Sequence, residues 1–171
     1  MSKKPFYTLN CSFNNDDFSK NVKDNLELVR KELGLDKIIQ LNQIHSSDVI
    51  TLYDKSENYN VKEADGIVTN IKGIGLSILG ADCAPILFYD NKSKIIGACH
   101  AGWRGAVNNI IESTIMKMEN IGSKRNNIIA IIGPSIHKNS YEIREDVANT
   151  VKSCFFYKEN SSILSNKKNG E

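Results

Sequence analysis

The sequence lacks a long unbroken apolar run and a strong excess of either charge. Its longest apolar stretch, residues 74–89, is interrupted by Asp82 and Pro85, which is not typical of a membrane span. The formal net charge of +2 is too small to indicate nucleic acid or an anionic lipid surface as a partner. No apolar segment with a cleavage site follows Lys3 and Lys4, so a signal peptide is not predicted. We therefore expect a cytoplasmic protein that binds neither membranes nor nucleic acids.

The sequence also lacks paired cysteines. Its four cysteines are scattered without a CxxC motif, and a chain of 171 residues with 40% apolar content can bury a core without disulfide bonds. Free thiols are the expected state in a reducing compartment. Length and even composition predict a single domain over residues 1–160, followed by a polar tail over residues 161–171.

Periodic apolar residues predict three helices and seven short strands. Steps of three and four residues favour helices over residues 17–34, 104–121 and 144–156. β-prone runs favour strands at residues 37–41, 48–53, 66–69, 74–79, 86–89, 94–99 and 128–132, the last of them buried. Short turn-forming connections at residues 70–73 and 90–93 predict two β-hairpins. The expected fold is α+β, a mixed β-sheet core flanked by helices.

Three potential metal ligands each follow a strand-like run. They are His45, Cys83 and His100, and a rigid sheet can hold loop side chains of this kind in fixed positions. Two imidazoles and one thiolate suit zinc or copper, and three protein ligands leave a coordination position open for water or substrate. Water bound there becomes acidic enough for hydrolysis or for deamination of a ring carbon. The pattern therefore favours a catalytic metal site.

The same residues allow two other interpretations. In the first, a buried Cys83 and two hydrogen-bonded histidines are structural. In the second, Cys83 is a nucleophile, His100 or His45 is its base, and Asp82 or Asp65 orients the imidazole. Two histidines would then compete for one thiol, which a site with three ligands explains more simply. Asp65 and Asp82 can each be a partner of a ligating imidazole, a general acid or base, or a turn residue.

The segment after His100 opens a predicted helix. Backbone N–H groups at residues 102–105 and the guanidinium of Arg104 could bind an anion such as phosphate, or Arg104 could pair with a surface carboxylate. Trp103 is interpreted as a core residue in preference to a stacking surface for a ring. His137 lies in a turn-rich segment and is expected at the surface.

Five segments in this order resemble one known family. They are Asn42-Gln43-Ile44-His45, Ala64-Asp65-Gly66-Ile67-Val68-Thr69, Ala81-Asp82-Cys83-Ala84-Pro85, His100-Ala101-Gly102-Trp103-Arg104-Gly105, and Gly133-Pro134-Ser135-Ile136 followed by Tyr141-Glu142-Ile143. The sequence is similar to the laccase-domain family, also known as the multicopper polyphenol oxidase or peptidoglycan-editing-factor family. The match spans roughly residues 7–151.

The resemblance implies a metal ion, zinc or in some members copper, held by His45, Cys83 and His100. It also implies a purine nucleoside phosphorylase that uses phosphate to cleave adenosine, inosine and methylthioadenosine, and that deaminates adenosine. The residues predicted to be catalytic are Cys83, Asp82 and Arg104, and Arg104 with its helix start is the candidate clamp for phosphate. The partners expected are therefore a purine nucleoside and phosphate.

The sequence departs from the family pattern in several places. Ser46 stands where glycine is common, and His137 and Ser140 lie in a segment that is usually rich in glycine and cysteine. The family's N-terminal Arg and paired glycines and its C-terminal Cys-Thr and Phe-Ser-x-Arg-Arg elements have no match, so we expect a domain shortened at both ends. The alternatives are a copper-dependent polyphenol oxidase, a Cys-His amide hydrolase in peptidoglycan editing, and an inactive remnant of the fold.

Overall fold

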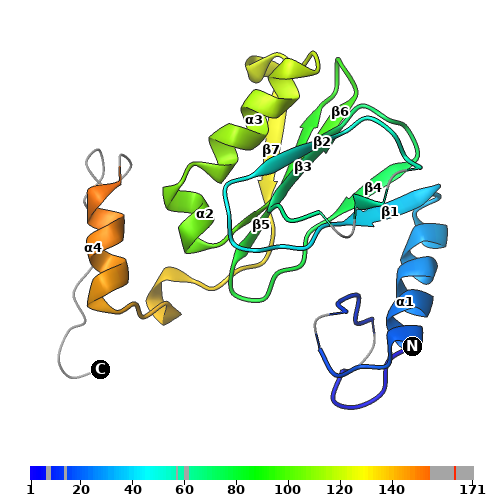
Figure 1. Ribbon diagram of the computed structural model, residues 1–171, viewed down its shortest axis with the longest axis horizontal. Coiled ribbons are helices and arrows are strands. Elements are labelled where there is room, and N and C mark those ends of the chain that lie inside the picture. The colour runs from blue at the N-terminus through cyan, green and yellow to red at the C-terminus, as the bar shows by residue number, and fades with distance from the viewer. Residues whose placement is uncertain (7–8, 14, 57, 60–61, 155–163, 165–171) are drawn as a thin grey trace.

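Two β-sheets organise the computed structural model, which describes residues 1–6, 9–13, 15–56, 58–59, 62–154 and 164 (Figure 1). One sheet has five strands and the other has two. The strands are β1 (Lys37–Gln40), β2 (Val49–Leu52), β3 (Gly66–Thr69), β4 (Ile74–Ser77), β5 (Ala84–Asp90), β6 (Ile95–Ala101) and β7 (Ile128–Ile132). The helices are α1 (Ser19–Glu32), α2 (Trp103–Val107), α3 (Ile110–Asn120) and α4 (Glu145–Ser153), with short 3-10 turns at Arg125–Asn127 and Lys138–Ser140.

The five-stranded sheet has the order β2-β3-β6-β5-β7. The pair β2 and β3 is parallel, whereas β3–β6, β6–β5 and β5–β7 are antiparallel. The small sheet pairs β1 with β4 in parallel. The expectation of an α+β fold with a mixed sheet core in a single domain is confirmed, although the strands divide between two sheets and the described helices number four α-helices, not three.

One of the two predicted hairpins is confirmed and the other is wrong. Strands β5 and β6 pair around residues 90–94, with Asp90 opposite Ile95. Residues 70–73 do not close a hairpin between β3 and β4, because β3 pairs with β2 and β6 while β4 pairs with β1. Gly73, at φ +79°, instead turns the chain toward β1, where its carbonyl accepts a hydrogen bond from the Asp36 N–H at 2.8 Å. A glycine turn alone does not tell which strands it joins.

The helix expected over residues 104–121 is broken in two. Helix α2 begins one residue earlier than predicted, at Trp103, and the chain turns at Asn108 and Asn109 before α3 starts. Asn109 has φ 65°, a left-handed conformation that asparagine tolerates better than most residues. The break lets α3 lie across β2, β3 and β6 while α2 remains beside the end of β6 (Figure 1).

The core has two parts, one on each face of the five-stranded sheet. Between α3 and the sheet lie buried residues of β3, β5, β6 and α3, namely Val68, Ile86, Phe88, Ile95, Cys99, Ile110 and Met118. The opposite face meets the small sheet and nearby loops through Ile39, Leu41, Leu52, Tyr59, Ala64, Ile67, Ile74 and Ala98. Strand β3 is buried along its whole length, so it anchors both halves of the core.

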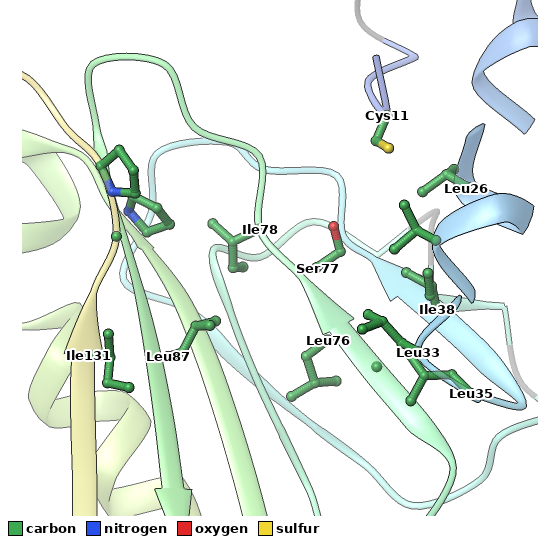
Figure 2. Close-up of a pocket in the computed structure, with 15 residues that line it drawn as sticks. Cys11, Leu26, Leu33, Leu35, Ile38, Leu76, Ser77, Ile78, Leu87 and Ile131 are labelled. Carbon is green, nitrogen blue, oxygen red and sulfur yellow. The ribbon is translucent and has the colours of Figure 1, made fainter. Parts of the chain in front are cut away.

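Strand β7 is an edge strand and is not the buried strand that its sequence predicts. Ile129, Ile131 and Ile132 are 59–67% exposed. Ile131 and Leu87 form one wall of an apolar groove of about 390 Å³, and residues of α1 and β4, among them Leu26 and Leu76, form the other (Figure 2). Apolar composition predicted the strand but not its position in the sheet.

The two outer helices confirm most of the sequence pattern. Helix α1 lies within the predicted range 17–34 and ends just before Gly34, whose φ of +63° stops the helix. Helix α4 ends at Ser153, before Cys154, and the predicted residues 155–156 lie outside the described part of the chain, as does the predicted tail at 161–171 apart from residue 164. The four cysteines are free thiols, as expected. Among the described helices, none is long and apolar enough to cross a bilayer.

The packing of α3 makes a testable prediction about stability. Met118 is fully buried between α3 and the sheet, whereas Met116 on the same helix is 53% exposed. We expect Met118→Ala to lower the free energy of unfolding by about 2–5 kcal/mol, because it removes buried volume. Met116→Ala is the matched control and should change it by less than about 0.5 kcal/mol. Urea unfolding followed by circular dichroism measures both, and equal effects would contradict the packing described.

Candidate metal centre

Three candidate ligands from separate segments meet beside the carboxyl end of β6. His45 lies in the connection between β1 and β2, Cys83 directly precedes β5, and His100 is near the end of β6. The candidate ligand atoms of these three residues lie within 4.8 Å of one another. The antiparallel register explains part of this proximity, since Pro85 lies opposite His100 and brings Cys83 to the same end of the sheet.

The three side chains differ in exposure. His100 is 4% exposed, Cys83 is half-buried and His45 is exposed. The two imidazole rings meet edge to face, with centroids 4.8 Å apart and an interplanar angle of 78°. The group is therefore anchored in the sheet at His100 and open to solvent on the side of His45, where a small molecule can approach.

Gly102 leaves the space in which the three side chains converge. A Cβ atom at this position would lie 3.1 Å from both Cys83 Sγ and His45 Cδ2, and 3.6 Å from His100 Cε1. The backbone of Gly102, at φ −68° and ψ 163°, is open to any residue. A side chain at this position would therefore crowd the three candidate ligands, although the backbone conformation would allow it.

The donor set fits a single metal ion. Two imidazoles and one thiol are ligands that zinc accepts, with bonds of about 2.0–2.3 Å. The candidate ligand atoms already lie within 4.8 Å of one another. One position would remain for water or substrate. In the described part of the chain, His45, Cys83 and His100 are the group of three potential metal ligands whose ligand atoms lie this close together.

Asp65 lies beneath the candidate ligands and is fully buried. Its Oδ1 atom accepts hydrogen bonds from the His45 N–H at 3.0 Å and faces His100 Nδ1 at 2.8 Å. Its Oδ2 atom accepts from the N–H groups of Ile44 at 3.1 Å and Ser46 at 2.7 Å, and from Ser46 Oγ at 3.0 Å. Of the roles considered for Asp65 from sequence, partner of an imidazole is the one that these contacts support.

Hydrogen bonds keep the Asp65 carboxyl ionised despite its burial. Burial by itself raises the pKa of this group, but the bonds from His100, Ser46 and Ile44 outweigh it, so the pKa lies below its ordinary value. Because an ionised carboxylate can only accept hydrogen bonds, Nδ1 of His100 must donate, and it therefore carries the ring proton. The Nε2 atom of His100 then keeps its lone pair for a metal.

Asp82, the other candidate carboxylate, is exposed, and its side chain forms no hydrogen bond within the described part of the chain. Its backbone carbonyl accepts from the Ile136 N–H at 2.9 Å, which ties the loop before β5 to the segment after β7. Its charge acts on the neighbouring thiol, since burial first, and then the carboxylates of Asp82 and Asp65, raise the pKa of Cys83. Asp82 therefore lies beside the three candidate ligands and acts on Cys83 through its charge, not through a hydrogen bond of its side chain.

Arg104 and Trp103 form a stacked pair at the start of α2. The Arg104 guanidinium carbon lies 4.6 Å from the centroid of the Trp103 ring. Arg104 is exposed and Trp103 half-buried, so the ring is neither a fully buried core residue nor a free stacking surface. None of the ion pairs recorded for the described residues involves Arg104, which leaves its charge directed to solvent. Within the described residues, Arg104 does not form the pair with a surface carboxylate that the sequence allowed.

Tyr141 is a residue near the site to which sequence reasoning assigned no role. The pKa of its hydroxyl is raised by burial and by the charges of Cys83 and Asp82, while Arg104 acts in the opposite direction. Tyr141 therefore lies within electrostatic range of both the thiol and the guanidinium. Its place in the Tyr141-Glu142-Ile143 motif was the available signal. His137, by contrast, is exposed as predicted.

Comparison with known proteins places the chain in a family. It belongs to the multi-copper polyphenol oxidoreductase laccase family, whose sequence model matches residues 1–171. It is 40% identical over 119 residues to a purine nucleoside phosphorylase of Rickettsia prowazekii, an alignment covering 70% of this chain and 48% of the relative. It is 35% identical over 156 residues to a purine nucleoside phosphorylase of Corynebacterium glutamicum, with 89% and 63% covered.

Two crystal structures share the fold. A Neisseria meningitidis protein superposes with a TM-score of 0.84 at 27% identity, covering 99% of this chain and 67% of its own. The hypothetical protein YfiH of Bacillus licheniformis gives a TM-score of 0.85 at 27% identity, covering 97% and 66%. The chain spans about half the length of the first curated relatives it matches, at 48% and 54%.

The environment of Cys83 predicts its reactivity in metal-free protein. A nucleophilic cysteine needs a lowered pKa, whereas burial, and then the carboxylates of Asp82 and Asp65, raise the pKa of Cys83 above its ordinary value. The thiol form should therefore persist at neutral pH, and alkylation by iodoacetamide should accelerate only at alkaline pH. Peptide-resolved mass spectrometry between pH 6 and pH 10 measures this. Rapid alkylation at pH 7 would contradict it and would favour the Cys-His hydrolase interpretation.

Proposed function

We propose that His45, Cys83 and His100 hold a zinc ion and that this centre serves a purine nucleoside phosphorylase. The observation that carries the proposal is the convergence of two imidazoles and one thiol around the space left by Gly102. The names of the relatives, at up to 40% identity, supply the class of reaction. Adenosine, inosine and methylthioadenosine are the proposed substrates, with phosphate as the second substrate and adenosine deamination as an accompanying activity.

The residues of the chain have distinct proposed tasks. A zinc ion, when bound, would polarise an oxygen atom of water or substrate at its open position. Asp65 holds the proton on Nδ1 of His100 at 2.8 Å and so orients that imidazole. The exposed side of His45 admits the substrate. Cys83 is proposed as a metal ligand, and the neighbouring carboxylate of Asp82 is proposed to take part in proton transfer.

Arg104 is the proposed contact for phosphate. A guanidinium can bind two phosphate oxygens at once, and stacking on Trp103 at 4.6 Å holds its plane while leaving the charge exposed. In phosphorolysis a phosphate oxygen attacks C1′ of the ribose, the bond to the purine breaks, and the purine leaves with the electron pair and takes a proton. A guanidinium at this position would bind the attacking phosphate and orient it toward the ribose.

The family description favours copper oxidase as a second candidate. Four-electron reduction of oxygen uses several copper ions, whereas the described residues bring together one group of three candidate ligands. The Cys-His hydrolase has less support, because the pKa of Cys83 is raised, not lowered. Phosphorolysis would use a single metal site and an exposed cation, both of which the described geometry can supply.

The test is a product analysis with adenosine in the presence and absence of phosphate. We expect adenine and ribose 1-phosphate only with phosphate, and inosine in either condition if deamination occurs. His45→Ala should lower both rates by on the order of 100-fold, a loss of roughly 2.7 kcal/mol in transition-state stabilisation. The exposed His137→Ala variant is the control. Metal-loaded protein that yields neither product would overturn the proposal and support the inactive remnant.

The space at Gly102 gives a second prediction. Gly102→Ala places a methyl group 3.1 Å from Cys83 Sγ and His45 Cδ2, on a backbone that accepts alanine. We expect the zinc affinity to fall by about tenfold, equivalent to roughly 1.4 kcal/mol, while the melting temperature of the metal-free protein stays nearly unchanged. Competition with a chromophoric chelator measures the affinity. Unchanged zinc binding would show that the ion does not lie among these three residues.

A further inference from the structure

We propose that Asp65 is the positioning residue of the metal centre, because its single carboxylate fixes both histidine ligands at once. It holds His45 through the backbone and His100 through the ring. This proposal rests on the proposed function in one respect, namely that these histidines bind a metal. The hydrogen bonds that support it join residues of this chain, and they can be measured in the metal-free protein.

On the His45 side, the Asp65 carboxylate accepts hydrogen bonds from three consecutive backbone N–H groups. The N–H groups of Ile44, His45 and Ser46 all converge on Asp65, at 3.1, 3.0 and 2.7 Å. His45 has φ 62°, a left-handed conformation that a residue with a Cβ atom adopts at a cost. Consecutive N–H groups turned inward in this way form an anion-binding nest. The carboxylate thus stabilises the backbone conformation that directs the His45 side chain toward the site.

On the His100 side, the contact is with the ring. Asp65 Oδ1 lies 2.8 Å from His100 Nδ1, and both side chains are buried. The backbone N–H of His100 also donates to the Asp65 carbonyl at 2.7 Å. Both the ring and the main chain of this ligand are therefore bound to one residue. A proton held on Nδ1 makes Nε2 the atom available to the metal.

The same oxygen atom serves both histidines. Oδ1 receives the His45 N–H and the His100 ring, while Oδ2 receives Ile44, Ser46 N–H and Ser46 Oγ. A displacement of this carboxylate would therefore move both ligands together. Asp65 also directly precedes β3, and its own N–H donates to the Asp48 carbonyl at 3.1 Å, so the start of the core strand sets its position.

Both carboxylate oxygens of Asp65 accept hydrogen bonds, and the Asp65→Asn variant replaces one of these acceptors by an NH₂ donor. If the amide nitrogen takes the Oδ2 position, it faces the N–H donors of Ile44 and Ser46. If it takes the Oδ1 position, it faces the His45 N–H and His100 Nδ1, and His100 can satisfy it only by moving its proton to Nε2. Either orientation disturbs at least one of the two histidine ligands, the first through the loop that carries His45 and the second through both His45 and His100.

Asp90→Asn is the matched control. Asp90 is also fully buried and lies at the far end of the β5–β6 hairpin. Its carboxylate accepts from the N–H groups of Lys92, Ser93 and Lys124 and from Ser93 Oγ, and none of these partners is a candidate ligand. Loss of this carboxylate reports the general effect of removing a buried, hydrogen-bonded charge.

The experiment combines two measurements on the wild type and both variants. Long-range proton–nitrogen correlation spectra of the metal-free proteins report which ring nitrogen of each of the three histidines carries the proton. Titration with Co²⁺, followed by thiolate-to-cobalt absorption, reports metal affinity. We expect the Nδ1–H form of His100 in the wild type and in Asp90→Asn, and its loss or mixing in Asp65→Asn. Cobalt affinity should fall by about 10–100-fold in Asp65→Asn only.

Each outcome separates this proposal from the proposed function. An unchanged His100 tautomer and unchanged cobalt affinity in Asp65→Asn would overturn the positioning role while leaving the metal site intact. Absence of cobalt binding in the wild type would overturn the metal site and with it the role of Asp65 in metal binding. If Asp65→Asn does not fold, hydrogen exchange on the wild type decides, and rapid exchange of the Ile44, His45 and Ser46 amides would overturn the proposal.

Discussion

The buried carboxylate of Asp65 is the interaction on which the candidate site depends. A buried anion is costly unless donors surround it, and here three backbone N–H groups, one hydroxyl and one imidazole do so. The same contacts that make the charge tolerable hold a left-handed residue in a loop and set the orientation of a ring in β6. Stability of the loop and geometry of the site therefore have a common origin.

The antiparallel register of β3, β6 and β5 supplies the rigid part of the arrangement. Gly66 pairs with Cys99 and Pro85 pairs with His100, so Asp65 and Cys83 reach the end of β6 from opposite sides. The site is thus built on paired strands, with only His45 contributed by a longer loop. The apolar groove beside α1 and the exposed edge at β7 lie outside this arrangement, since no candidate ligand lines the groove (Figure 2).

Local patterns predicted local structure well. The apolar face of α1 and the short connection in the β5–β6 hairpin are properties of neighbouring residues, and both are confirmed. The pairing of β4 with β1, and of β3 with β2, joins strands that are distant in sequence, and no local signal specifies such parallel pairs. The exposure of β7 could not be predicted from the sequence either, because an apolar edge strand and a buried strand have the same composition.

At the site, the sequence by itself determined the chemistry available: two imidazoles, one thiol, a glycine, and carboxylates and an arginine nearby. It also indicated that the potential ligands follow strands, which is why their meeting could be expected. Only the tertiary structure decided between Asp65 and Asp82 as the partner of His100, because that choice depends on which carboxylate is buried beneath the ring. Contacts between residues far apart in the chain arise from strand pairing, and a linear sequence does not record that pairing directly.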